Sequence, residues 1–84
     1  MSKTASGISG YVYTAKSITI KFHSGNAYRY DVSEALTKAN LEKMIKLAKS
    51  GSGLNSFISK HKEIAKYAYI DNTLPKSSYK TYGE

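Results

Sequence analysis

The 84-residue chain has no cysteine, no tryptophan, one proline and no long apolar run. Without cysteine, neither a disulfide nor a thiolate metal site can hold the fold together, and the absence fits a reducing compartment. A membrane-spanning helix needs about 20 apolar residues in a row. The first ten residues, MSKTASGISG, are too polar for a signal peptide. We therefore expect one small cytoplasmic domain that does not enter a membrane.

Acidic side chains are also scarce. Six Asp and Glu stand against 13 Lys and Arg, which gives a net charge of +7 and a pI near 9.6. Such a field favours polyanions: nucleic acid, nucleotides, phospholipid head groups or an acidic protein surface. Arg29 is the only arginine, and reading of base edges relies on the planar fork of arginine, so sequence-specific duplex recognition is poorly supported. Lysine-rich solubility explains the same composition.

The motifs of common enzyme classes are missing. The chain contains neither a G-x-x-x-x-G-K-[ST] phosphate loop nor a G-x-S-x-G elbow. Matches to S-x-x-K begin at Ser59 and Ser77, but a chain this rich in serine and lysine yields them by chance. His61 lies within an apolar helical stripe, which is typical of a structural histidine. We expect a protein without catalytic residues, metal or cofactor.

Three segments near the N-terminus are strand-like, residues 11–13, 18–22 and 28–32, because they are rich in β-branched and aromatic residues. A turn over residues 24–26 would pair Phe22 with Tyr28 and set Lys21 opposite Arg29. From Ser33, a suitable N-cap, the periodicity becomes helical, and a second helix follows the glycines at 51 and 53. The sequence predicts an α+β fold, with a three-stranded antiparallel meander packed against two C-terminal helices. This single domain would span residues 8–70, between polar tails at 1–7 and 71–84.

Two groups of cations are candidates for anion binding. One is the exposed sheet face with Lys21, Arg29 and His23; the other is the polar face of the first helix, with Lys38, Lys46 and Lys49. A bound anion would relieve the repulsion between like charges on paired strands. Side chains that splay into water, softened by the nearby Asp31, account for the sheet pattern equally well.

Four of the eight tyrosines lie near or within the C-terminal tail, where no apolar pattern requires them: Tyr67, Tyr69, Tyr79 and Tyr82. Tyr67, Tyr79 and Tyr82 are the candidate interaction residues. Tyrosines among lysines can stack on bases. They are also typical anchors of protein–protein contacts. The sequence leaves both interpretations open.

The stretch FHSGNAYRYDV at residues 22–32 resembles the central signature of the KTSC domain, a family named for a segment at the C-terminus of some lysyl-tRNA synthetases. Ala48, the Ser50-Gly51 pair and the NSFI stretch at residues 55–58 resemble its second conserved block. The resemblance implies a β-β-β-α-α domain and transfers no catalytic residue. Its link to a synthetase points weakly to nucleic acid, and short members of the family are common in bacteria and their phages.

The leading hypothesis is a non-enzymatic binder of an anionic ligand, with nucleic acid or a nucleotide as first candidate and affinity that falls with salt. The alternative is a phage-type interaction protein that inhibits a host defence factor, or an oligomer that sequesters a nucleotide signal. Tyr79 and Tyr82 would anchor such contacts. Exposed edge strands also allow pairing with a second copy of the chain.

Overall fold

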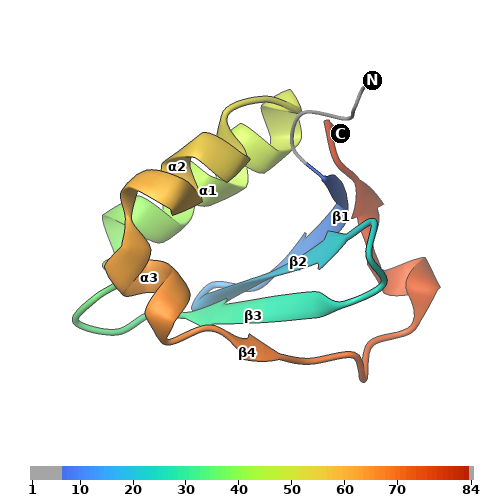
Figure 1. Ribbon diagram of the computed structural model, residues 1–84, viewed down its shortest axis with the longest axis horizontal. Helices are drawn as coiled ribbons and strands as arrows, with labels where there is room; N and C mark the ends of the chain where they lie inside the picture. The colour runs from blue at the N-terminus through green and yellow to red at the C-terminus, as the bar shows by residue number, and fades with distance from the viewer. Residues whose placement is uncertain (1–6, 84) are drawn as a thin grey trace.

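The computed structural model describes residues 7–83, apart from the side chain of Lys76, and shows a five-stranded antiparallel sheet with helices on one face (Figure 1). The strand order is β4-β3-β2-β1-β5. The predicted α+β class is confirmed, with two strands and one helix more than expected. The elements are β1 (Ile8–Tyr13), β2 (Ser17–Phe22), β3 (Ala27–Asp31), α1 (Lys38–Ser50), α2 (Leu54–Lys60), α3 (Lys62–Lys66), β4 (Tyr69–Ile70), the 3-10 helix η1 (Lys76–Ser78) and β5 (Lys80–Thr81).

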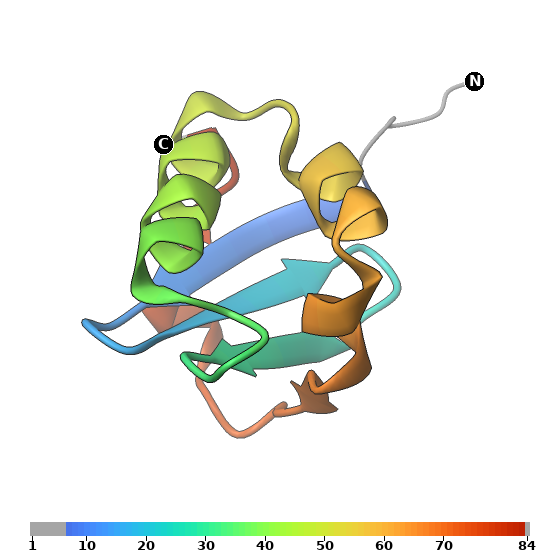
Figure 2. The same cartoon turned by 90° about the vertical axis from the view of Figure 1, so that its left-hand side faces the viewer.

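A single core lies between the sheet and the helices α1, α2 and α3, which cover the same sheet face (Figure 2). Alternate residues of β2, Ile18 and Ile20, point into it, because successive side chains of a strand face opposite sides. From α1, Leu41 and Met44 are buried at helical spacing, and Leu54 of α2 completes the centre. Lys21, next to Ile20 in the chain, therefore lies on the sheet face that the helices do not cover.

The second hairpin closes one residue earlier than predicted. Its loop consists of residues 23–25, bounded by a hydrogen bond of 2.9 Å from the Phe22 amide to the Asn26 carbonyl oxygen. Gly25 takes a φ of 104° at the last loop position, and its amide donates to the Phe22 carbonyl oxygen at 3.0 Å. This is the three-residue loop that requires a left-handed residue at its end.

The earlier loop shifts the pairing of β2 with β3 by two positions. Lys21 lies opposite Ala27, and Arg29 lies opposite Thr19. Since the shift is an even number, every side chain keeps its predicted face. The expected like-charge pair between Lys21 and Arg29 is wrong, and the repulsion inferred from it does not exist.

The helices begin and end at different residues from those expected. Ser33 does not cap α1; its Oγ accepts the amide of Leu36 at 3.2 Å in a turn that lets Leu36 reach the core. Thr37 is the N-cap, so α1 begins at Lys38. The predicted second helix is broken at His61, whose φ of −117° and ψ of 65° separate α2 from α3.

The segment that follows β4, expected to be a polar tail from residue 71 onward, adds the edge strand β5 to the sheet. β4 pairs with β3 at one edge and β5 pairs with β1 at the other, so the chain between them passes from edge to edge. It crosses the face opposite the helices, where the Asn72 Oδ1 accepts the Ala27 amide at 2.8 Å. Thr19 and Ala27 are buried on this face as a result. The crossing segment, residues 71–79, is called the strap below.

Candidate anion-binding site

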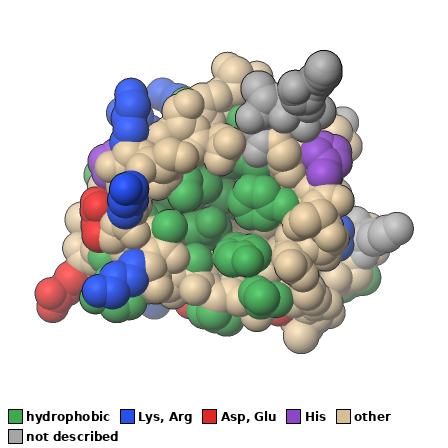
Figure 3. Space-filling view, viewed as in Figure 1, with side chains coloured by type: hydrophobic (Ala, Val, Ile, Leu, Met, Phe, Trp, Pro, Cys, Tyr) green, Lys and Arg blue, Asp and Glu red, His purple; other side chains and the backbone are tan. Residues whose placement is uncertain are grey.

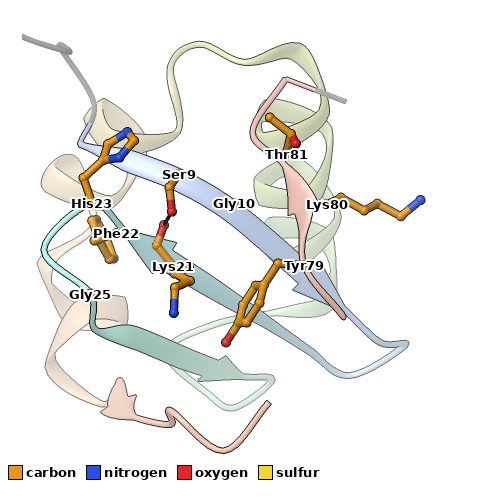
Figure 4. Close-up of a pocket in the computed structure, with 9 residues that line it drawn as sticks. All are labelled: Ser9, Gly10, Lys21, Phe22, His23, Gly25, Tyr79, Lys80 and Thr81. Atoms are coloured by element: carbon orange, nitrogen blue, oxygen red, sulfur yellow. Dashed lines mark hydrogen bonds between the residues drawn. The ribbon is translucent and has the colours of Figure 1, made fainter. Parts of the chain in front are cut away.

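A cavity of about 480 Å³ lies on the strap side of the sheet, between the end of β2 and the residues that lead into β5 (Figure 4). Its volume is in the range of small-ligand pockets. It brings together Lys21, His23 and Tyr79, which the sequence indicated in separate segments. The residues around this cavity, called the lysine hollow here, are Ser9, Gly10, Lys21, Phe22, His23, Gly25, Tyr79, Lys80 and Thr81.

A β-bulge in β1 shapes one wall of the lysine hollow. The register with β2 shifts between Ile8 and Gly10, which leaves Ser9 as the extra residue. The Ser9 hydroxyl donates to the Lys21 carbonyl oxygen at 3.3 Å. At Gly10 an added Cβ would lie 2.8 Å from the carbonyl oxygen of Lys80, so glycine permits the close approach of β5. Bulges of this kind are frequent beside functional sites because they redirect neighbouring side chains.

The Lys21 ammonium lies over the Tyr79 ring, with Nζ 5.4 Å from the ring centroid. Figure 4 shows both side chains extending in the same direction, with His23 at the rim, while the Lys80 side chain points away from the cavity. The Tyr79 hydroxyl is buried and has no hydrogen-bond partner among the described residues. Burial, followed by the charge of Asp71, raises the pKa of Tyr79, so its phenol stays a neutral donor.

The lysine hollow offers donors to an anion and no competing acid. None of the described residues that line it is Asp or Glu. Lys21 supplies a full positive charge beside the Tyr79 ring, and charge-assisted hydrogen bonds from an ammonium are the stronger ones in proteins. His23 adds a further hydrogen-bonding group at the rim. A phosphate group suits this set of donors.

Arg29 and Lys38 lie elsewhere, around a second cavity of about 640 Å³ that also includes Lys16 and Asp31. The Arg29 Nε is 2.8 Å from the Asp31 Oδ1, and its Nη1 is 3.9 Å from a carboxylate oxygen of Asp71. The hydrogen bond and the charge of Asp31 raise the pKa of Arg29. Its charge is thus largely compensated within the chain. Sequence reasoning did not select Lys16.

The two remaining lysines of the candidate set, Lys46 and Lys49, are exposed on α1. The Lys49 Nζ lies 5.2 Å from the centroid of the Tyr13 ring, a cation–π contact. Neither lysine lines the lysine hollow. Their positions fit an ordinary solvent-exposed helix face as well as they fit contacts with a ligand.

The tyrosines chosen as interaction residues divide into two kinds. Tyr82 packs against the core, and Tyr79 lines the lysine hollow with its hydroxyl buried. Tyr67, by contrast, is 66% exposed. Two neighbours at the β4 edge are also exposed, Tyr69 at 48% and Ile70 at 55%. The sequence grouped Tyr69 with the other tyrosines near the tail without choosing it as an interaction residue, and it did not indicate Ile70, because β4 itself was not expected.

Comparison with known proteins gives no match to a family model, to a curated protein or to a solved structure. The resemblance to the KTSC domain therefore stays a prediction. Within residues 7–83, no helix is long and apolar enough to cross a membrane. The same residues contain no group of three acidic or histidine side chains arranged to hold a metal ion.

Proposed function

We propose that this chain is a non-enzymatic, cytoplasmic binding protein for a phosphate-bearing ligand, with nucleic acid as the first candidate, and that phosphate binds in the lysine hollow. The observation that carries the proposal is the meeting of Lys21, His23 and Tyr79 around a cavity lined by no described acid. The net charge of +7 favours the approach of a polyanion. The resemblance to a synthetase-linked family agrees with this class of ligand.

In this proposal phosphate oxygens accept hydrogen bonds from the Lys21 ammonium, which the Tyr79 ring holds in place by a cation–π contact. Lys38, Lys46 and Lys49 contribute long-range attraction rather than defined contacts. Arg29 contributes less than its charge suggests, because Asp31 and Asp71 compensate it. Affinity comes mainly from phosphate contacts and falls steeply with salt.

The test is a titration of the protein against short RNA, single-stranded DNA and duplex DNA at two salt concentrations. Lys21→Glu should weaken binding about tenfold or more, because it removes a charged hydrogen bond and adds repulsion at the site. Lys60→Glu on α2 changes the net charge equally at an exposed position outside the hollow, and should have a much smaller effect. Equal losses in both variants, or no binding at low salt, would contradict the proposal.

A second candidate is a protein-interaction role, as an inhibitor of a host factor or as a homo-oligomer. It is favoured by the exposed apolar side chains of Tyr67, Tyr69 and Ile70 beside a sheet edge. Sedimentation at rising concentration tests self-association, and Tyr67→Ser should weaken any complex that uses this surface. A chain that stays monomeric and whose complexes do not respond to Tyr67→Ser would contradict this role.

A further inference from the structure

A second hollow, on the helix side of the same hairpin end, has a different chemistry. Its volume is about 450 Å³, and its walls are formed by Phe22, Tyr28 and Tyr30 of the sheet and Ala65 of α3, with His23 at the rim. Figure 3 shows hydrophobic side chains exposed in a depression near the centre of this face. We call it the aromatic hollow. It adjoins the lysine hollow, because Phe22 and His23 line both.

The aromatic walls of this hollow can receive a further ring. Phe22 and Tyr28 meet edge to face, with centroids 5.7 Å apart and an interplanar angle of 78°, so the two rings do not stack face to face on each other. Tyr30 is only 4% exposed, and burial followed by the nearby Tyr28 raises its pKa to about 12, so its hydroxyl stays protonated. Ala65 presents a methyl group where a larger side chain would fill the space.

We propose that the aromatic hollow binds an unpaired base of the strand whose phosphate binds in the lysine hollow, so that the ligand is single-stranded nucleic acid. This inference rests on the proposed function. A base has π faces that stack on aromatic side chains and polar edges that suit the Tyr28 and Tyr30 hydroxyls. In a duplex the base is paired and stacked, and it cannot enter a hollow of this kind without leaving the helix.

The neighbourhood of the two hollows favours a base over other apolar occupants. The rings of Phe22 and Tyr28 can stack on a flat aromatic group, and an aliphatic chain offers no π face for such stacking. A nucleotide carries a flat aromatic group and an anionic group joined by a short linker, and therefore uses both hollows. Aromatic stacking tolerates every base, so we expect strand selectivity with little sequence preference.

The experiment compares three probes on the intact chain: a single-stranded oligonucleotide, an abasic strand of the same length, and the matching duplex. The wild-type protein should bind the base-containing strand about tenfold or more tightly than the abasic strand. Ala65→Leu should lower the affinity for the base-containing strand to that for the abasic strand, and should leave the affinity for the abasic strand unchanged. Ala39→Leu, at an exposed alanine on α1, adds the same atoms outside the hollow and should leave all three affinities unchanged.

NMR gives a second measurement that does not depend on a variant. The ring signals of Phe22 and Tyr28 should shift on addition of the base-containing strand and not of the abasic strand. The inference is overturned if the wild-type protein binds the base-containing and abasic strands equally tightly, or if Ala65→Leu still prefers the base-containing strand. The proposed function stands in either case if Lys21→Glu weakens binding. If no probe binds at low salt, the proposed function fails and the inference fails with it.

Discussion

A methyl group added at Gly10 would meet the main chain of the C-terminal segment. The Cβ of Gly10→Ala would lie 2.8 Å from the Lys80 carbonyl oxygen and 3.4 Å from the Tyr79 Cβ. The first of these contacts is too short for atoms that keep their places, and the obstructing atom belongs to the backbone. Gly10 is not among the glycines with positive φ. Alanine can therefore adopt its backbone conformation, and the cost comes from the contact with β5.

The size of the effect follows from which strand moves. β5 pairs with β1 at only two positions, whereas β1 and β2 pair at five. Each β5 hydrogen bond contributes about 0.5–1.5 kcal/mol, so β5 is displaced before β1 is. Overpacking of this kind typically costs about 1–3 kcal/mol. We expect Gly10→Ala to lower the free energy of unfolding by about that amount, with the disturbance confined to the C-terminal segment.

Urea unfolding measures the total cost, and amide hydrogen exchange locates it. The Tyr82 amide donates to the Ser9 carbonyl oxygen at 3.2 Å and the Gly83 amide to that of Ala48 at 2.9 Å, so both amides should lose protection. Gly25→Ala is the control: its φ of 104° strains alanine, but its Cβ would contact nothing within 4 Å. It should destabilise the chain without selective loss at those two amides. Retained protection of Tyr82 and Gly83 in Gly10→Ala would refute the reasoning.

Three further predictions concern the core and two titrating groups. Met44→Ala should cost about 2–5 kcal/mol in chemical denaturation, because Met44 is fully buried. The pKa of Tyr30 is raised from 10.0 to about 12. Its contribution to stability is therefore complete below pH 10 and is lost as the pH rises towards 12. Tyr30→Phe should lose less stability than the wild-type protein over that range. The Thr73 hydroxyl and amide lower the pKa of Asp71. The contribution of Asp71 to stability is therefore present above the ordinary pKa of 3.8 and is lost as the pH falls through the lowered pKa. Thr73→Ala should move the Asp71 pKa back towards 3.8 in an NMR titration.

The register of the β2–β3 hairpin shows which features the hydrophobic pattern can predict and which it cannot. Alternation in residues 18–22 and 28–32 predicted two adjacent strands and the face of every side chain. It could not separate the true pairing from one displaced by two positions, because both put the same residues on the core side. The decision depended on Gly25, which must occupy the left-handed position that ends a three-residue loop. The prediction placed the loop at residues 24–26, one residue too late.

The edge strands β4 and β5 could not be predicted in the same way. Each has two residues, too few to show a period, and each pairs with a strand far away in the sequence. Lys21, His23 and Tyr79 were identified by charge and aromatic character. That they surround one cavity depends on the path of the strap, which local pattern does not contain. The separation of Arg29 from Lys21 was missed because it follows from the register.

The lysine hollow and the C-terminal segment depend on each other, because Tyr79 and the residues after it form one of its walls. A ligand that binds only when this wall is in place stabilises the attached state. The apparent affinity falls in proportion to the fraction of molecules in which the wall is detached. Gly10→Ala leaves Lys21 and His23 unchanged, yet it should weaken phosphate binding to the extent that it releases β5. Added ligand should in turn restore the exchange protection of Tyr82, and this reciprocity distinguishes a site built on the strap from lysines that attract anions wherever they lie.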